Sequence, residues 1–260
     1  MSGTRPIGEP NGPFRVDHVR EGDRYELSQG HPIYCAPGGG NHARGAVTGA
    51  LVLATDPAVE EAGMDAGYRM GDRNLHAPDV AVGNVPDRPG WIEGVPPLAV
   101  EYAARGQDEG DLAEKIEYFL ANGTQAVWVV RLEGHRRVEV FEPGREMRVA
   151  GPGDLLTAPG ILARPVPAEA LFDAEAARDA ALHNMLSRYG YRDLSEVRQE
   201  GREEGRLAGM RADLLAVLET RGLALATEDI ARIEACADSE DLRRWLLRAV
   251  VATAAEGLLD

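Results

Sequence analysis

The chain has 260 residues, of which 44% are hydrophobic and 27% charged, a globular composition that allows one sizeable core with an appendage or two modest domains. No apolar run approaches the roughly 20 residues that span a bilayer, and the first residues lack the apolar centre of a signal peptide, which favours a cytoplasmic protein over a membrane or exported one. The formal net charge of −15 argues against broad nonspecific binding to nucleic acid, which needs a basic surface.

The first segments indicate a flexible lead-in followed by a β-hairpin. Residues 1–13 are rich in Gly and Pro and are expected to be flexible. The runs RYELS and HPIYC flank the turn residues Gln29 and Gly30, a pattern typical of two paired strands. Glu26 lies in the first of these strands, where it is either a solvated strand residue or an acid of an active site.

A helix is expected within the run PGGGNHARGAVTGALVLAT. Asn41 can cap a helix that starts near His42, and Val47, Leu51 and Val52 recur at helical spacing. The GGG run matches neither the dinucleotide fingerprint nor the phosphate-binding loop, and no strong strand leads into it. We therefore expect no nucleotide site here and place His42 in the first turn of the helix, with a position near the active cleft as the alternative.

Two acidic residues lie on neighbouring predicted strands. Asp79 begins the strand APDVAV, and Glu101 follows three apolar residues in the strand LAVEYA. An ionised glutamate in a strand that is apolar on both faces is costly to bury unless it is paired or bound to a cation. The two acids therefore indicate a site for a hard cation such as Mg²⁺ or Mn²⁺, with a salt bridge from Glu101 to an arginine as the alternative.

The chain's only lysine lies on the helix that follows these strands. Of the 28 basic residues 27 are arginine, and the exception is Lys115. A capping box of Asp111 and Glu114 indicates the start of this helix. Lys115 flanks the apolar stripe, so its compact amine can lean toward the sheet and act as a point donor, which a guanidinium fork does less well. The stripe consists of Leu112, Ile116, Phe119 and Leu120.

The chain changes character after the strands AVWVV and RVEVF and a proline-rich exit. Residues 168–260 contain no strand-like run and are dominated by Ala, Arg, Glu and Leu, which predicts four helices. The charges of the EGREEGR segment nearly cancel and it has no aromatic residue, which favours a solvated or coiled-coil helix over RNA binding. We expect a helical extension that serves self-association or contact with a protein partner.

Several of these segments together resemble a known family. RYELSQGHPIY, His42, APDVAV, LAVEYA and the block from Lys115 to Val130 occur in the order seen in the Uma2 family, a group of restriction endonucleases within the PD-(D/E)XK nuclease superfamily. The resemblance covers residues 15–165, and the ordered set is more specific than any single motif. It implies an α/β fold, a restriction-endonuclease-like mixed β-sheet flanked by helices over residues 14–165, followed by an all-α extension over 168–260.

The resemblance also implies a metal site. Asp79 matches the aspartate of the PD motif and Glu101 the second acid, both implied ligands of Mg²⁺ or Mn²⁺, with the backbone carbonyl of Tyr102 beside them. The lysine usual two residues after the second acid is Ala103 here. The family pattern places a lysine on the following helix instead, and Lys115 matches it.

Glu26 matches the early glutamate of the family's first hairpin, as an additional acid that binds metal or receives a proton. The implied function is metal-dependent hydrolysis of DNA, and a homodimer is expected because double-strand cleavage needs two sites. One alternative is a nuclease fold that has lost catalysis and acts as a binding or regulatory module through its helical tail. Another is an interaction protein whose acids only form salt bridges.

Overall fold

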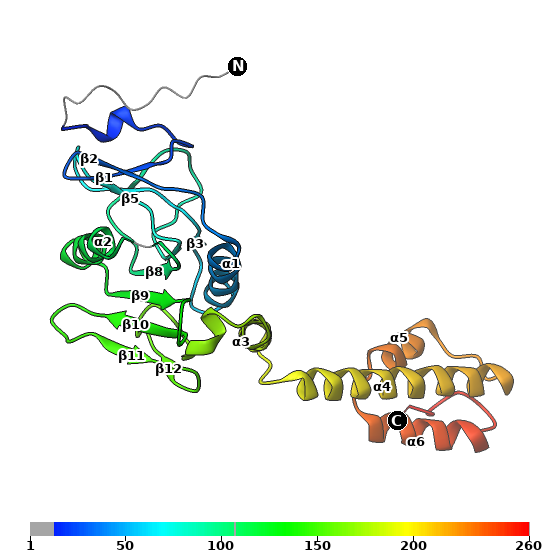
Figure 1. Cartoon of the computed structure of the whole chain (residues 1–260). Helices are drawn as coiled ribbons and strands as arrows, with labels where there is room; N and C mark the ends of the chain where they lie inside the picture. Colours follow the sequence, from blue (N-terminus) through cyan, green and yellow to red (C-terminus); the bar gives the residue numbers. More distant parts are fainter. Residues whose placement is uncertain (1–12, 107, 260) are drawn as a thin grey trace. The chain divides into compact units, whose positions relative to one another are not determined.

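The computed structural model describes residues 13–106 and 108–259, so the flexible segment expected over 1–13 lies outside the described part except for Pro13. Contacts divide the chain into two compact units, and the division falls after Gly190. The first unit is a mixed α/β structure and the second is helical (Figure 1). The short helix η2 (Ala168–Leu171) and α3 (Ala174–Arg188), which the sequence grouped with the extension, therefore belong to the first unit.

A six-stranded sheet forms the centre of the first unit. Its strand order is β11-β10-β9-β8-β6-β3. Strands β8 and β9 run parallel, joined by helix α2 (Glu109–Ala121), and the other neighbouring strands are antiparallel. The bounds are β3 Ala62–Gly63, β6 Val80–Val82, β8 Leu98–Ala103, β9 Ala126–Arg131, β10 Arg137–Phe141 and β11 Arg148–Ala150.

A second sheet is built on the N-terminal hairpin. Strands β1 and β2 pair from Tyr25↔Tyr34 to Ser28↔His31, which confirms the predicted hairpin, and Gln29 adopts a positive φ of 51° in the turn. The sheet order is β2-β1-β5-β4-β7. The bounds are β1 Tyr25–Ser28, β2 His31–Tyr34, β4 Tyr68–Arg69, β5 Leu75–His76 and β7 Ile92–Glu93, and a separate ribbon pairs β12 Leu155–Leu156 with β13 Val166–Pro167.

The two faces of the six-stranded sheet bury different cores. Because side chains alternate along a strand, β8 directs Leu98, Val100 and Tyr102 into one core and Ala99 and Ala103 into the other. The first core includes residues of helix α1 (Gly40–Ala54), and the second is closed by α2. Glu101 belongs to the alternating set that faces α2, so the strand period directs a carboxylate toward the helix that carries Lys115.

Helix α1 approaches β8 closely because two of its residues lack a side chain. A Cβ at Gly45 would lie 2.7 Å from the ring of Tyr102, and one at Gly49 would lie 2.0 Å from its hydroxyl oxygen. The Tyr102 hydroxyl donates to the carbonyl of Leu171 at 2.9 Å, so the ring is held between α1 and η2. The helix begins at Gly40 with Gly39 as N-cap, not with Asn41 as the sequence predicts.

Helix α2 is capped one turn earlier than the sequence predicts. Asp108, not Asp111, is the N-cap, and its carboxylate accepts from the backbone N–H groups of Gly110 and Asp111. Leu112, Ile116 and Phe119 are buried as expected. The error does not change the face that the helix presents, because the apolar spacing and not the cap sets its rotation about the axis.

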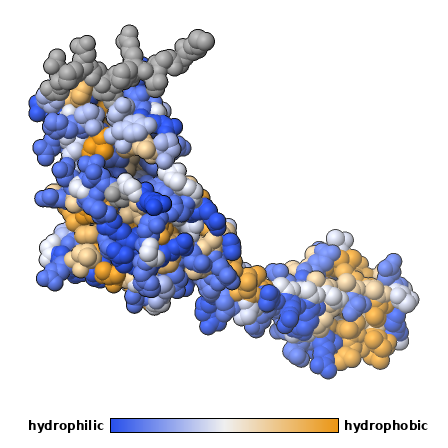
Figure 2. All heavy atoms as spheres, in the orientation of Figure 1, coloured by the Kyte–Doolittle hydropathy of each residue, from blue (hydrophilic) through white to orange (hydrophobic). Residues whose placement is uncertain are grey.

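The second unit has a core of its own. Helices α4 (Leu194–Thr220), α5 (Thr227–Ala235) and α6 (Ser239–Val251) bury a cluster that includes Leu214, Leu218, Ile233, Leu242 and Trp245. Residues 200–206 of α4, the EGREEGR segment, are exposed throughout, as expected for a solvated helix. Apolar side chains gather on the face of this unit seen in Figure 2.

Within the described part of the chain, no helix combines the length and the apolar character needed to cross a membrane.

Replacing Gly49 by Ala tests the close approach of α1. The new Cβ would meet the Tyr102 hydroxyl oxygen, and Tyr102 cannot move away because it is 1% exposed and bonded to Leu171. Overpacking of this kind is expected to lower the free energy of unfolding by about 1–3 kcal/mol. Gly40→Ala is the matched control in the same helix, because a Cβ there has open space. Equal stability of both variants in urea unfolding would contradict the steric explanation.

Candidate active site

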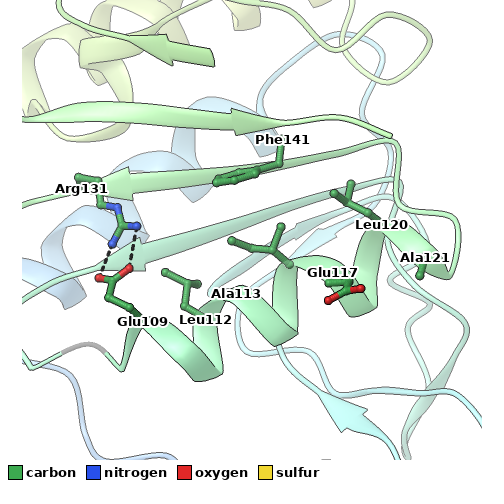
Figure 3. A pocket seen from close by; sticks show the side chains of 9 residues that line it. Glu109, Leu112, Ala113, Glu117, Leu120, Ala121, Arg131 and Phe141 are labelled. Carbon is green, nitrogen blue, oxygen red and sulfur yellow. Dashed lines mark hydrogen bonds and ion pairs between the residues drawn. The ribbon is translucent and has the colours of Figure 1, made fainter. Parts of the chain in front are cut away.

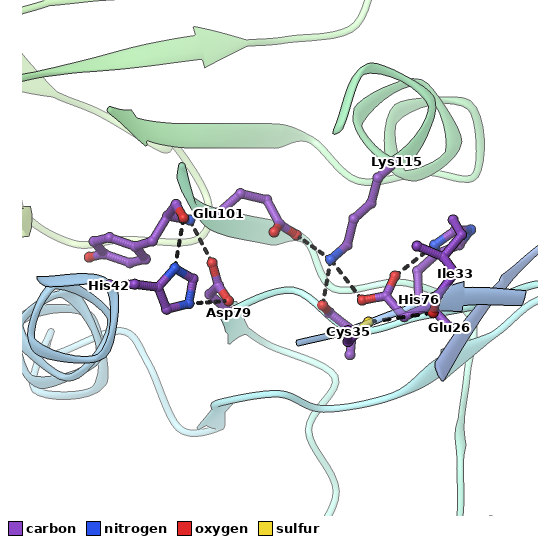
Figure 4. Close-up of polar contacts among 10 residues, drawn as sticks. Glu26, Ile33, Cys35, His42, His76, Asp79, Glu101 and Lys115 are labelled. Atoms are coloured by element: carbon purple, nitrogen blue, oxygen red, sulfur yellow. Dashed lines mark hydrogen bonds and ion pairs between the residues drawn. The ribbon is translucent and has the colours of Figure 1, made fainter. Parts of the chain in front are cut away.

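Four residues that the sequence singled out lie together at one end of the central sheet (Figure 4). Glu26 comes from β1, Asp79 directly precedes β6, Glu101 lies in β8, and Lys115 projects from α2. These positions are far apart in the sequence, and the fold brings their side chains to one place.

Lys115 is the centre of the first half of this site. Its Nζ donates to Glu26 Oε1 at 3.0 Å and to the backbone carbonyl of Ala77 at 2.6 Å. Glu101 Oε1 lies 3.0 Å from the same Nζ as an ion pair. The three charged side chains are only 14%, 13% and 9% exposed for Lys115, Glu26 and Glu101, so water screens these contacts weakly.

Glu26 is held from its other side by a histidine. His76, on β5, is 1% exposed, and its Nδ1 lies 3.0 Å from Glu26 Oε2. The His76 ring packs against Tyr118 of α2, with ring centroids 4.3 Å apart. Glu26 therefore bridges His76 and Lys115, which indicates a residue that holds the lysine in position.

The acids of this cluster titrate in opposite directions. Burial alone would raise the pKa of Glu26, but the charge of Lys115 and the bond to His76 lower it to about 2. Burial raises the pKa of Glu101 to about 8, and the charges of Asp79 and Glu26 add to this rise against the opposing charge of Lys115. Despite the cost of burial, the pKa of Lys115 is raised by Glu101, Glu26 and Asp79, so the lysine stays charged.

Asp79 and Tyr102 form the second half of the site with a histidine from α1. Asp79 Oδ2 accepts from the backbone N–H of Tyr102 at 2.6 Å, and Asp79 Oδ1 lies 3.1 Å from His42 Nε2. His42 Nδ1 donates to the Tyr102 carbonyl, which can only accept, at 2.9 Å. The hydrogen bond to Asp79 raises the pKa of His42.

A further acid stands near this half of the site. Burial raises the pKa of Asp65, and the charge of Asp79 raises it further while His42 lowers it. Asp65 also has a positive φ of 53°, uncommon for a residue other than glycine. Neither feature is visible in the sequence, where Asp65 is one acid among 43.

The donor set suits a hard divalent cation. Carboxylates at Asp79 and Glu101 and the Tyr102 carbonyl supply oxygen atoms, which Mg²⁺ prefers, and Mg²⁺ commonly takes only one or two carboxylates and keeps several waters. No described donor forms an aligned hydrogen bond to the buried Glu101 Oε1, despite its nearness to Lys115. Among the described residues no group of three or more His, Cys, Asp or Glu side chains is arranged to hold a metal, so such a cation would depend on the carbonyl and on water.

Sequence reasoning located the acids and the lysine but missed three of their partners. No sequence pattern marks His76 or the Ala77 carbonyl. His76 contacts Glu26, and the Ala77 carbonyl accepts from Lys115, only because the fold brings these distant segments together. His42 was placed in the first turn of its helix, with a position near the active cleft as the alternative, but its contacts with Asp79 and Tyr102 were not foreseen. Its sequence signal is the run of glycines before it, since a Cβ at Gly38 would lie 2.6 Å from the His42 ring.

A cavity of about 390 Å³ lies elsewhere in the first unit (Figure 3). It lies between the outer flank of α2 and Phe141 of β10, and a bidentate pair between Arg131 and Glu109 borders it. None of the site residues above lines this cavity, so it is separate from the candidate active site.

Comparison with known proteins identifies the family of the chain. A family model described as "Putative restriction endonuclease" matches residues 14–166, more than half of the chain. The chain belongs to the Uma2 family. Membership confirms the resemblance seen in the sequence and makes the chain a nuclease-family protein. No curated protein matches it.

A solved structure supports the fold of this Uma2 protein. The crystal structure of "a putative nuclease belonging to DUF820" from Anabaena variabilis matches with a TM-score of 0.53 and 19% sequence identity. The match covers 64% of this chain and 99% of that chain. At this identity the likeness shows the fold alone, and it confirms the predicted restriction-endonuclease-like α/β core.

The opposed charges around Lys115 predict a pH-dependent contribution of Glu26 to stability. The pKa of Glu26 falls from its usual 4.5 to about 2 in the folded protein, so its stabilising effect is complete above pH 4.5 and is lost as pH falls toward 2. Wild type is therefore expected to exceed Glu26→Gln in free energy of unfolding most clearly near pH 6, and by less at pH 3.

Urea unfolding at both pH values measures this difference. Glu101, whose pKa is also shifted in the folded protein, is present in both proteins, so its own contribution to the pH dependence largely cancels in this difference. Glu117→Gln, at an exposed position of α2, is the matched control. A difference between wild type and Glu26→Gln that is the same at pH 3 and pH 6 would contradict the ion-pair interpretation.

Proposed function

We propose that the first unit is a metal-dependent endonuclease that hydrolyses phosphodiester bonds of DNA. The observation that carries this proposal is the convergence of Asp79, Glu101 and the Tyr102 carbonyl beside a buried, charged Lys115. Membership of a family described as restriction endonucleases supports the same reading. Burial raises the pKa of Glu101, and the charges of Asp79 and Glu26 raise it further, a shift that is common among acids of active sites.

Asp79, Glu101 and the Tyr102 carbonyl would hold the cation. When bound, Mg²⁺ or Mn²⁺ would lower the pKa of a coordinated water and offset charge that develops on the phosphate. The cluster carries more acids than bases, because Glu26, Asp79 and Glu101 surround the single ammonium of Lys115. A divalent cation would relieve this excess and allow Glu101 to ionise.

Lys115 would act as a fixed point donor. Its ammonium is oriented by Glu26 and by the Ala77 carbonyl, and it lies 3.0 Å from Glu101 Oε1. From this position it would orient the attacking water or donate to the phosphate in the transition state, where preorganised charge is most effective. Glu26, in turn, would hold Lys115 in place and keep it charged.

The helical second unit would mediate assembly, either as a homodimer or with a protein partner. It buries its own core, and α6 exposes Leu247, Val250 and Val251 at helical spacing. Cleavage of both DNA strands needs two active sites, which favours the homodimer.

Two substitutions test the nuclease proposal. Asp79→Asn is expected to abolish Mn²⁺ binding in calorimetry and cleavage of plasmid DNA, because it removes a charged ligand. Lys115→Ala is expected to keep Mn²⁺ binding and to lower the cleavage rate by about 10²–10³-fold, the usual cost of one transition-state donor. Asp179→Asn, at an exposed position of α3, is the control. Full activity of Lys115→Ala would remove the role assigned to it.

The same measurements separate the nuclease from a catalytically silent fold. Binding of Mn²⁺ that is lost in Asp79→Asn, without cleavage of any DNA form, would support a binding or regulatory module. Absence of Mn²⁺ binding in the wild type would reject the metal site.

Removal of the second unit tests its assembly role. A chain that ends at Gly190 keeps the two cores that flank the central sheet and all site residues. It is expected to bind Mn²⁺ as the full chain does but to be monomeric in light scattering, whereas the full chain is dimeric. A monomeric full chain would contradict the homodimer.

A further inference from the structure

The central sheet has a gap beside Tyr102. Strand β6 pairs with β8 from Val80↔Val100 to Val82↔Leu98, but β8 continues to Ala103. Past Val100, the backbone groups of β8 that point toward β6 have no strand of the described residues beside them. Buried backbone groups need partners, and here side chains supply them.

Three hydrogen-bond contacts close a ring across this gap. Tyr102 N–H donates to Asp79 Oδ2, the Tyr102 carbonyl accepts from His42 Nδ1, and His42 Nε2 lies 3.1 Å from Asp79 Oδ1. His42 thus contacts both the carbonyl oxygen of Tyr102 and a carboxylate oxygen of Asp79. Figure 4 shows the His42 ring beside the Asp79 carboxylate.

The fold fixes His42 in this place from three directions. Gly45 and Gly49 allow α1 to lie against the Tyr102 ring, and the absence of a Cβ at Gly38 leaves room for the imidazole. The Asn41 side chain accepts from the His42 backbone N–H at 2.9 Å. A histidine that only filled space would not need both nitrogens aimed at acceptors.

We propose that His42 is a positioning residue of the metal site, which orients the Asp79 carboxylate and the Tyr102 carbonyl from helix α1. This inference rests on the proposed function, because those two groups are expected ligands there. Asp79 precedes β6 and so lies outside the strand pairing, and the ring gives it a second contact beyond Tyr102 N–H. Partners that orient metal ligands contribute about 10–100-fold to metal affinity.

Mn²⁺ calorimetry on His42 variants of the full chain tests this role. His42→Ala is expected to weaken Mn²⁺ binding by about 10–100-fold. His42→Asn places an amide N–H near the Nδ1 position and His42→Gln near the Nε2 position, so at least one should bind more tightly than His42→Ala. His183→Ala is the matched control, because His183 is exposed on α3 and bonds by Nδ1 to the Asp179 carbonyl of its own helix.

Cleavage kinetics separate positioning from direct catalysis. If His42 acts through the ligands, saturating Mn²⁺ should restore the cleavage rate of His42→Ala to within a few-fold of wild type. A rate that stays low with Mn²⁺ bound would overturn positioning in favour of a direct catalytic role. Thermal unfolding of each variant shows whether any loss of binding comes from lost structure, and the Asn and Gln variants keep the test valid if the Ala variant unfolds.

The outcomes separate this inference from the nuclease proposal. Wild-type binding that is lost in Asp79→Asn but unchanged in His42→Ala would overturn the role of His42 alone. Binding that depends on both residues, without DNA cleavage, would reject the nuclease and retain the positioning role. Failure of the wild type to bind Mn²⁺ would overturn both.

Discussion

The buried ammonium of Lys115 is the constraint on which the site depends. It is shared between Glu26 of β1, Glu101 of β8 and the Ala77 carbonyl before β6, so one charge connects both sheets to helix α2. Loss of either acid would leave the buried ammonium with a single carboxylate partner and would destabilise the fold. The acids outnumber the lysine, and burial together with the charges of Asp79 and Glu26 raises the pKa of Glu101. In the proposed function, the same imbalance would favour binding of a divalent cation.

The other half of the site arises where regular structure ends. Strand β6 stops short of Tyr102, and Asp79 and His42 satisfy the backbone groups that a strand would otherwise pair. Where a strand ends, side chains and not regular strand pairing bind the backbone groups, so functional side chains can be placed there. Gly45 and Gly49 let α1 approach Tyr102 closely, and this close approach allows His42 to contact both Asp79 and the Tyr102 carbonyl.

The acidic character of the chain bears on how it would meet DNA. With a net charge of −15, the protein has little general attraction for a polyanion. Affinity would then depend on the cation and on local arginines, and on any second copy that doubles the contact. The helical unit, with a separate core and exposed apolar residues on α6, is the natural element for such assembly.

The sequence by itself determined the α/β core, the hairpin, the solvated start of α4, and the identities of Asp79, Glu101, Lys115 and Glu26 as notable residues. These follow from hydrophobic period, turn chemistry and a single lysine in an arginine-rich chain, which are local signals. It misplaced the N-caps of both helices by a few residues. Helix α1 begins after Gly39, which has no side chain to form a capping bond, and α2 is capped by Asp108, three residues before the expected Asp111. Only the tertiary structure decided that Glu101 pairs with Lys115 and not with an arginine, that His76 supports Glu26, and that His42 joins Asp79 to Tyr102. Such contacts join residues up to 89 positions apart in the sequence. No local pattern can specify them, because the packing of α1 and α2 on opposite faces of one sheet determines which side chains meet.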